Sequence, residues 1–291
     1  MMSLFIYTII ILVLLGGVAA IILYYTAQKF KVYEDPHIDQ VTETLPGANC
    51  GGCGFAGCRS LAEAIVKSED ATGLYCPVGG NEVMKKVAEL LGRTAQAKTP
   101  AVAVVRCSGS PEFRPRTSVY NGASSCALIH SMYIGDTGCP YGCLGCGDCV
   151  DVCHFGAIKM DPATMLPVVD DALCTACGAC VKACPRSIIE LRNKAKQDRK
   201  IYVSCVNKDK GGIARKYCQV ACIGCGKCFK VCGFGAITIA DNLAFIDSKQ
   251  CKLCRKCVEV CPTGAILELN FPPKKVEENT DTQESASVLT T

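Results

Sequence analysis

The sequence predicts an α+β protein that consists of an N-terminal transmembrane helix, a small helical domain with four spaced cysteines, and two tandem copies of one cysteine-rich module. Three observations lead to this prediction: an uncharged apolar run near the start, 25 cysteines among 291 residues, and a long internal repeat. Aromatic residues make up only 7% and tryptophan is absent, so disulfides or metal are expected to hold the small units together. Because the apolar fraction is 49%, disorder throughout the chain is excluded.

The predicted transmembrane segment is an uncharged run that covers residues 4–25. At about 1.5 Å per residue it is roughly 33 Å long, enough to cross a bilayer core of about 30 Å. A cleaved signal peptide is the alternative, but no basic residue precedes the run and it exceeds a usual signal-peptide core. Lys29 and Lys31 follow the run directly, so the positive-inside rule places the rest of the chain on the cytoplasmic side. We expect a single-pass anchor at residues 1–26 of a protein in the cytoplasmic (inner) membrane.

Two short regions separate the anchor from the repeat. Residues 27–44 are polar and are expected to form a spacer. A small helical domain is predicted for residues 45–92, in which Ser60 and Glu63 match a capping box at the start of one helix. A second helix is predicted after Asn81, because apolar residues then fall on one face.

The rest of the chain is a duplication with a period of about 79 residues, long enough for a small domain. Residues 144–161 match residues 223–241, and residues 173–191 match residues 250–269. The predicted bounds are a linker with a β-prone segment at 93–138, a first module at 139–192, a connecting segment at 193–217, a second module at 218–270 and a mobile tail at 271–291.

Short strands are predicted directly after the cysteine runs of the two modules, and brief helices are expected to carry the cysteines themselves. The predicted strands are residues 157–160, 188–191, 236–239 and 265–269.

Four runs of the two modules share the spacing CxxCxxCxxxC, which is the spacing of bacterial ferredoxins with two [4Fe–4S] clusters. In that arrangement three close cysteines bind one cube, and the fourth reaches the partner cube of the same module. The predicted sets are Cys143, Cys146, Cys149 with Cys184; Cys174, Cys177, Cys180 with Cys153; Cys222, Cys225, Cys228 with Cys261; and Cys251, Cys254, Cys257 with Cys232.

Zinc is the alternative metal for these runs. Structural zinc sites usually present two CxxC pairs separated by a longer loop, whereas three cysteines at successive three-residue steps favour cubes. Pro185 and Pro262 follow the fourth cysteine as in ferredoxins, while His154 and Gly233 take the two other such places. This departure changes the local turn and leaves the ligand atoms unchanged.

The helical domain carries a different pattern of cysteines, at Cys50, Cys53, Cys58 and Cys76. Glycines between them allow the backbone to approach an inorganic core and donate amides to its sulfurs. The spacing fits an iron–sulfur cluster, but it also suits zinc, so both remain open from the cysteine pattern.

The segment LPGANCGGCGFAGC (residues 45–58), with CPVGG (residues 76–80) after it, resembles the B subunit of the Rnf complex, an ion-translocating ferredoxin:NAD oxidoreductase. The resemblance covers roughly residues 1–270, including the order of anchor, four-cysteine domain and ferredoxin modules. It implies that Cys50, Cys53, Cys58 and Cys76 bind a [4Fe–4S] cluster, which makes five clusters in all. Shorter members of the family have one two-cluster module, whereas this chain has two.

The resemblance also implies the function, which is to accept electrons from soluble ferredoxin and pass them to flavin-bearing, NAD-binding and multi-span membrane subunits. The redox reaction would be coupled to translocation of Na⁺ or H⁺ by those partners. We find no Rossmann fingerprint or P-loop, so the chain is expected to bind no nucleotide. Two alternatives are a polyferredoxin subunit of a membrane hydrogenase or formate dehydrogenase, and a non-catalytic iron–sulfur sensor.

Five cysteines stay outside these assignments: Cys107, Cys126, Cys139, Cys205 and Cys218. Their simplest interpretation is that of small buried residues, and the alternatives are a sixth metal site or substitute ligands for neighbouring cubes. The formal charge of +4 counts every thiol as neutral. Because clusters held by thiolates add negative charge, this basic balance is not interpreted as nucleic-acid binding.

Overall fold

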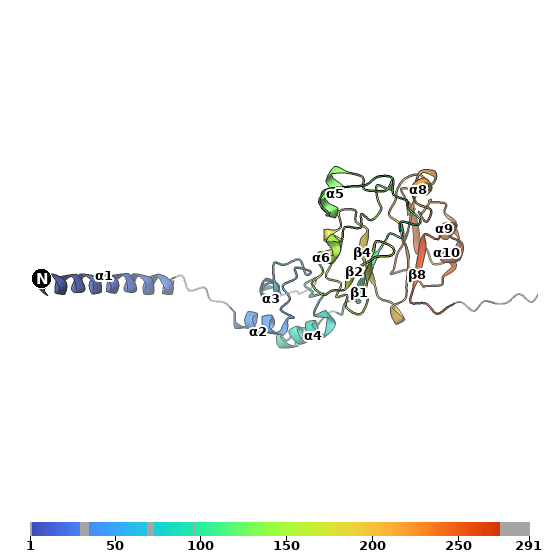
Figure 1. Ribbon diagram of the computed structural model, residues 1–291. Coiled ribbons are helices and arrows are strands. Elements are labelled where there is room, and N and C mark those ends of the chain that lie inside the picture. Colours follow the sequence, from blue (N-terminus) through green and yellow to red (C-terminus); the bar gives the residue numbers. More distant parts are fainter. Residues whose placement is uncertain (1, 30–34, 69–72, 96, 274–291) are drawn as a thin grey trace, which may run out of the picture.

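The computed structural model describes residues 2–29, 35–68, 73–95 and 97–273. The predicted mixture of helices and strands is confirmed (Figure 1). Residues 274–291 of the predicted tail, and residues 30–34 of the predicted spacer, lie outside the described residues.

The N-terminal helix α1 spans Met2–Lys29. Within it, Ile9–Lys29 is long and apolar enough to cross a membrane, with a mean hydropathy of 2.5. From Ile9 onwards every side chain of the helix is exposed, so α1 has no apolar partner within the described chain. This candidate span agrees with the predicted anchor.

The four-cysteine domain contains three helices, α2 (Pro36–Thr44), α3 (Cys58–Lys67) and α4 (Gly80–Leu90). Their apolar faces meet in a core that includes Ile38, Val41, Leu61, Ile65 and Val87. The predicted spacer is therefore corrected at residues 36–44, which form part of this domain. Proline suits the first turn of a helix because its missing N–H has no partner there, and a polar stretch can still place two apolar residues on one face.

The start of α3 also differs from the predicted capping box, because the helix begins at Cys58 and Ser60 lies inside it. The side chain of Asn49 accepts a hydrogen bond from the Cys58 amide at 2.8 Å, so a residue nine positions earlier caps this helix. At the other end, the Arg93 guanidinium donates to the carbonyl oxygens of Ile65 and Ser68. These contacts fix the helix that carries Cys58.

The first module contains two antiparallel two-stranded sheets. Strand β1 (Ala101–Val105) pairs with β4 (Ile189–Asn193), and β2 (Ile158–Asp161) pairs with β3 (Leu166–Val169). Its short helices are α5 (Cys126–Met132), α6 (Asp148–Asp151) and α7 (Ala179–Ala183). The predicted linker 93–138 thus supplies an edge strand of this module.

The second module repeats this plan. Strand β5 (Lys200–Val203) pairs with β8 (Ile266–Leu269), and β6 (Ile237–Ala240) pairs with β7 (Leu243–Ile246). Its helices are α8 (Gly211–Tyr217), α9 (Lys227–Val231) and α10 (Lys256–Glu259), and a 3₁₀ turn, η1 (Lys196–Asp198), precedes it. The predicted connecting segment 193–217 therefore belongs largely to the second module.

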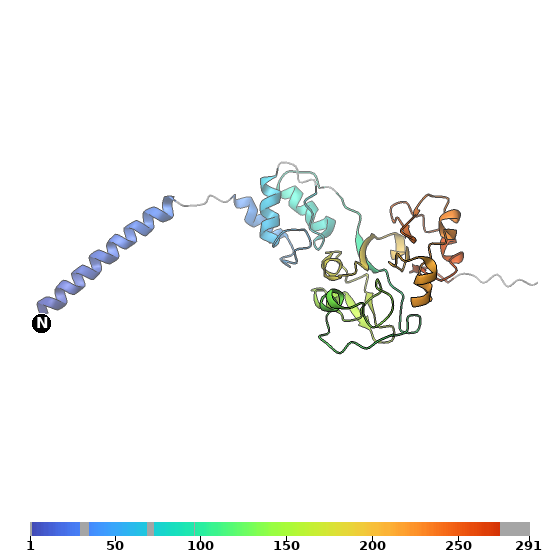
Figure 2. The same cartoon turned by 90° about the horizontal axis from the view of Figure 1, so that it is seen from above.

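The two modules lie side by side, as Figures 1 and 2 show from two directions. Two buried arginines connect them. Arg106 donates from Nε to the Val203 carbonyl at 3.2 Å and pairs with Glu190, and Arg192 donates to the Ile201 carbonyl at 3.1 Å. Because buried charges are tolerated only when they are paired and hydrogen-bonded, these contacts fix the modules against each other.

Candidate metal centres

The four cysteine runs adopt one backbone conformation. Left-handed residues occur two and four positions after the first cysteine of every run, with φ between 56° and 93°. The earlier position is occupied by Gly145, Ala176, Gly224 and Leu253, and the later one by Gly147, Gly178, Gly226 and Arg255. A non-glycine residue pays roughly 1–2 kcal/mol in this conformation, so its recurrence at Ala176, Leu253 and Arg255 indicates a strict demand of the loop.

Alternation of right- and left-handed residues turns successive backbone N–H groups toward one side, which forms a nest for anionic groups. Iron–sulfur clusters are among the ligands that such nests bind. A short helix follows each nest and carries the third cysteine of the run, at Cys149 in α6, Cys180 in α7, Cys228 in α9 and Cys257 in α10. The predicted brief helices are thus present.

In the second module, cysteines from the two runs meet in two pockets. One of about 350 Å³ is lined by three cysteines of the first run and the last cysteine of the second, namely Cys222, Cys225, Cys228 and Cys261. The other, of about 330 Å³, is lined by Cys232, Cys251, Cys254 and Cys257. These are the two crosswise sets expected from the spacing.

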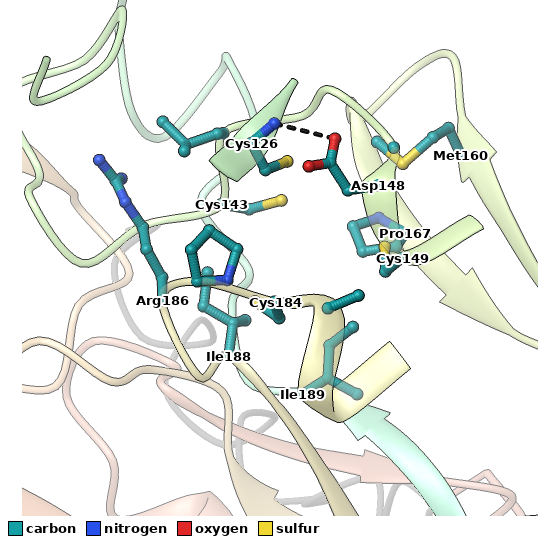
Figure 3. A pocket seen from close by; sticks show the side chains of 14 residues that line it. Cys126, Cys143, Asp148, Cys149, Met160, Pro167, Cys184, Arg186, Ile188 and Ile189 are labelled. Atoms are coloured by element: carbon teal, nitrogen blue, oxygen red, sulfur yellow. Dashed lines mark hydrogen bonds between the residues drawn. The ribbon is translucent and has the colours of Figure 1, made fainter. Parts of the chain in front are cut away.

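In the first module, Cys143, Cys149 and Cys184 line a pocket of about 420 Å³. The fourth cysteine at this pocket is Cys126 and not the expected Cys146 (Figure 3). The pKa of the Cys146 thiol is raised to about 12 by burial and by the charge and hydrogen bond of Cys126, so the two thiols are neighbours. This site therefore has five cysteines, one more than a cube needs.

Asp148 fixes the position of Cys126. Its carboxylate accepts hydrogen bonds from the backbone amides of Cys126 at 2.8 Å and Ala127 at 3.1 Å, and from the Ser125 hydroxyl at 3.0 Å. The start of α5 is thereby tied to α6, as the dashed line in Figure 3 indicates for Cys126. The sequence singled out Cys126 only as an unassigned cysteine, because it lies 17 residues before the first run.

The remaining set of the first module is gathered around Cys180. Burial raises the pKa of the Cys180 thiol to about 11, and the thiols of Cys174, Cys177 and Cys153 contribute to the shift. The same crosswise proximity holds for Cys149, whose pKa is raised to about 12 by burial and by neighbouring thiols that include Cys184.

In the four-cysteine domain, Cys76 is buried and its pKa is raised, first by burial and then by the thiols of Cys58 and Cys53. The Gly79 amide donates to the Cys76 sulfur at 3.4 Å. Cys50 begins the same loop as Cys53, in which Gly51 has a φ of 66°. The structure thus gathers Cys53, Cys58 and Cys76, and Cys50 lies at the start of the loop that carries Cys53.

The loop between Cys50 and Cys53 touches the first module at Gly52. A Cβ atom at this position would lie 2.8 Å from the Cβ atom and the carbonyl oxygen of Cys177. Only glycine fits such an approach without displacing backbone, so two cysteine loops from different domains are in direct contact. From the sequence, these glycines were expected to approach an inorganic core, and the contact of Gly52 with another domain was not predicted.

The donor sets fit clusters better than single ions. Within the described residues, no group of three or more His, Cys, Asp or Glu side chains is placed to hold one metal ion. A zinc ion would require four sulfurs at about 2.3 Å from a common centre. Thiols distributed around pockets, on loops with left-handed residues at two fixed positions, suit a larger anionic cluster. All 25 cysteines are free thiols, so none is taken up by a disulfide.

Comparison with known families agrees with these sites. The family model for an Fe-S cluster domain (FeS) matches residues 45–77. The family model described as "4Fe-4S dicluster domain" matches twice, at residues 142–188 and 221–265. [4Fe–4S] clusters are therefore supported for both modules, and an iron–sulfur cluster for the four-cysteine domain.

Three relatives, each the B subunit of its complex, are similar over most of the chain. That of the ion-translocating oxidoreductase complex of Methanosarcina acetivorans is 42% identical over 86% of this chain and 93% of its own length. The B subunit of the Na(+)-translocating ferredoxin:NAD(+) oxidoreductase complex of Acetobacterium woodii is 44% identical over 83% of this chain and 71% of its own length. The B subunit of the proton-translocating ferredoxin:NAD(+) oxidoreductase complex of Clostridium ljungdahlii is 38% identical over 83% of this chain and 84% of its own length.

Proposed function

Because the chain belongs to the family of B subunits of ion-translocating ferredoxin:NAD(+) oxidoreductase (Rnf) complexes, we propose that it is their iron–sulfur electron relay. It accepts electrons from reduced soluble ferredoxin and passes them to flavin-bearing and NAD-binding partner subunits. The observation that carries this proposal is the shared left-handed geometry of the four cysteine runs, combined with their crosswise cysteine sets.

The cysteines would hold five [4Fe–4S] clusters, in the sets expected from the sequence. When bound, a cluster of this kind supplies a site that takes up and releases one electron at a time. The chain's own residues surround the runs with apolar cores. They also donate amides to the sulfurs of two proposed ligands, from Gly79 to Cys76 and from Ala103 to Cys174. In the Cys143 site, Cys126 offers an additional thiol.

The contacts between loops suggest an order of sites. The four-cysteine domain touches the first module where Gly52 meets Cys177, a proposed ligand of the Cys174 site. Crosswise ligation then joins that site to the Cys143 site within one module. The Cys222 and Cys251 sites are joined in the same way in the second module, so the five proposed sites form two linked groups, one in each half of the relay.

The relay is proposed to lie on the cytoplasmic side of the membrane. The apolar span of α1 ends at Lys29, and basic residues favour the cytoplasmic side of such a span. No charged residue precedes Lys29 in the span, so we assign the ion path to the multi-span partner subunits. The relatives' names specify sodium in one case and protons in another, so the proposed coupling ion is Na⁺ or H⁺.

Stopped-flow spectroscopy with reduced ferredoxin tests this function. Anaerobically purified full-length chain should be brown, and mixing with reduced ferredoxin should bleach its visible absorbance. A cluster-loaded chain that is bleached by dithionite but not by reduced ferredoxin would contradict the proposed relay. A colourless chain that contains only zinc would contradict the clusters themselves.

A further inference from the structure

Four cysteines outside the proposed sites form two equivalent pairs. Cys107 follows the end of β1 by two residues, and Cys205 follows the end of β5 by two residues. Cys139 and Cys218 each precede the first cysteine of a module by four residues. The duplication therefore gives each module one cysteine after its edge strand and one before its first run.

The fold brings the two pairs together where the modules meet. The hydroxyls of Ser108 and Ser204, which adjoin Cys107 and Cys205, lie 2.6 Å apart. In addition, Nη2 of Arg106 donates to the Cys205 carbonyl at 3.2 Å.

The second cysteine of each pair faces the other module. The Asn207 side-chain amide donates to the Cys139 sulfur at 3.5 Å, so a residue of the second module contacts a cysteine of the first. A Cβ atom on Gly109 would lie 3.4 Å from the Cys218 sulfur, which gives the reciprocal contact. Cys139, Cys205 and Cys218 are buried and Cys107 is half-buried, so their sulfurs are largely shielded from solvent.

Each sulfur of this group has an N–H donor or another thiol of the group beside it. The Cys143 amide donates to the Cys107 sulfur at 3.5 Å. Burial raises the pKa of the Cys205 thiol to about 12, while the amides of Asn207 and Cys222 lower it. In both modules, the backbone amide of the first cysteine of the first run, Cys143 or Cys222, lies beside the cysteine that follows the edge strand. For Cys218, burial raises the thiol pKa and the thiols of Cys107 and Cys139 contribute to the shift.

A buried arginine beside the group lacks a full set of partners. Arg114 is only 8% exposed, and its Nη2 donates to the Cys143 carbonyl at 2.7 Å. Its Nε and Nη1 have no hydrogen-bond partner among the described residues. A Cβ atom added to Gly109 would lie 3.2 Å from Nε of Arg114 and 3.4 Å from the Cys218 sulfur, so this guanidinium is close to that thiol. A buried guanidinium with free N–H groups requires a negative charge nearby, and neutral thiols do not supply one.

We propose that Cys107, Cys139, Cys205 and Cys218 bind a sixth [4Fe–4S] cluster at the boundary between the two modules. Four thiolates on an oxidised core carry a net charge of about −2, which would satisfy Arg114. A zinc ion with four thiolates would carry the same charge, and the metal content of the chain distinguishes the two.

The position of this site extends the proposed function, on which the inference rests. Cys107 accepts from the amide of Cys143, a ligand of the last proposed site in the first module. The amide and thiol of Cys222, a ligand of the first proposed site in the second module, lie beside the Cys205 thiol. The sixth cluster would therefore fill the gap between the two halves of the relay.

Metal analysis of the full-length chain, purified anaerobically, tests the inference. Wild-type protein should contain about 24 irons and no zinc, because six cubes hold four irons each. Replacing Cys107 or Cys218 by alanine should each remove about four irons and leave the Mössbauer signals of the other cubes unchanged. The matched comparison is Cys251→Ala, which belongs to a set of four cysteines without a spare thiol and should remove a different signal.

The outcomes separate the two proposals. About 20 irons in the wild type, unaffected by Cys107→Ala and Cys218→Ala, would overturn the sixth cluster and leave the five-cluster relay intact. About one zinc per chain that is lost in both variants would also overturn it in favour of a zinc site. A wild type without iron would overturn both proposals. The wild-type count decides even if a variant fails to fold.

Discussion

At the residue scale, the cysteine loops depend on backbone conformation as much as on the cysteines. Gly147, Gly178 and Gly226 occupy a left-handed position that glycine adopts without cost, and Arg255 occupies the equivalent position in the fourth run. Arg255 is held there by an ion pair with Glu268. The same loop is thus formed from different residues, which a search for glycine alone would not find.

The crosswise sets can be tested with single cysteines of the second module. Cys261→Ala should perturb the same electron paramagnetic resonance signal as Cys222→Ala, because both line one pocket. Cys251→Ala should perturb a different signal, since Cys251 lines the other pocket. The pairing is wrong if the Cys261→Ala spectrum matches that of Cys251→Ala instead.

The additional thiol in the first module predicts an unequal effect of two substitutions. Cys146→Ala should keep close to the full iron content, because Cys126 lines the same pocket as Cys143 and Cys184 and can take the open corner. The double variant Cys126→Ala, Cys146→Ala should lose about four irons. Iron analysis of both variants measures this. Loss of about four irons from Cys146→Ala alone would show that Cys126 cannot substitute.

At the element scale, the contact between the four-cysteine domain and the first module depends on one glycine. Gly52→Ala should push this loop away from Cys177, since its Cβ atom would lie 2.8 Å from backbone and side-chain atoms there. We expect ferredoxin-dependent NAD⁺ reduction by membranes that contain the whole complex to fall on the order of tenfold at unchanged iron content, because small displacements between reacting groups are costly.

The matched control for this variant is Gly212→Ala in α8, where a Cβ atom would meet no atom within 4 Å. This variant should retain wild-type activity and iron. Equal activity of Gly52→Ala and Gly212→Ala would show that electrons do not pass through the Gly52 contact.

Elements near the cysteines could be predicted from the sequence, and those far from them could not. The strand predicted at 188–191 is present as β4, because a β-branched run follows the cysteines directly. Its partner β1 lies about 90 residues earlier, and local composition does not encode so distant a pairing. Likewise, α2 was predicted as spacer because its burial depends on Leu61 and Ile65 of another helix.

The candidate sites could likewise be predicted where the signal is local, and could not be predicted where the fold brings distant residues together. Regular spacing identified the cysteines of the four runs, since three-residue steps are a local signal. Cys126 and the group of Cys107, Cys139, Cys205 and Cys218 are brought together only by the fold. The equivalent positions of Cys107 and Cys205, and of Cys139 and Cys218, in the two repeats were the one signal in the sequence that these four act together, and Cys126 has no such counterpart.

At the scale of the whole molecule, binding of clusters is coupled to the loss of protons from buried cysteine thiols. Burial raises the pKa of Cys143, Cys149 and Cys257 to about 12 and that of Cys228 to about 11, so these thiols are neutral at pH 7 without metal. A ligand must be a thiolate, so cluster assembly has to displace these protons. Lower pH should therefore favour loss of the clusters.

This balance predicts proton release on cluster assembly. Anaerobic transfer of preformed chloride-ligated cubes to the metal-free chain in weakly buffered solution at pH 7 should release about one proton per ligating thiol, because the displaced chloride leaves without taking up that proton. A pH indicator or pH-stat titration measures the release, with a cube-free addition as the control. Much less than one proton per ligand would show that the thiols are already charged in the metal-free chain.

Whether this chain is a row of one-electron sites can be measured by a reductive titration of the full-length protein in the absence of air. The brown colour should bleach with an uptake of about six electrons per chain, one for each cube. Uptake of about five would retain the relay without the cluster between the modules. No uptake by an iron-loaded chain, or a colourless chain with zinc alone, would contradict the account.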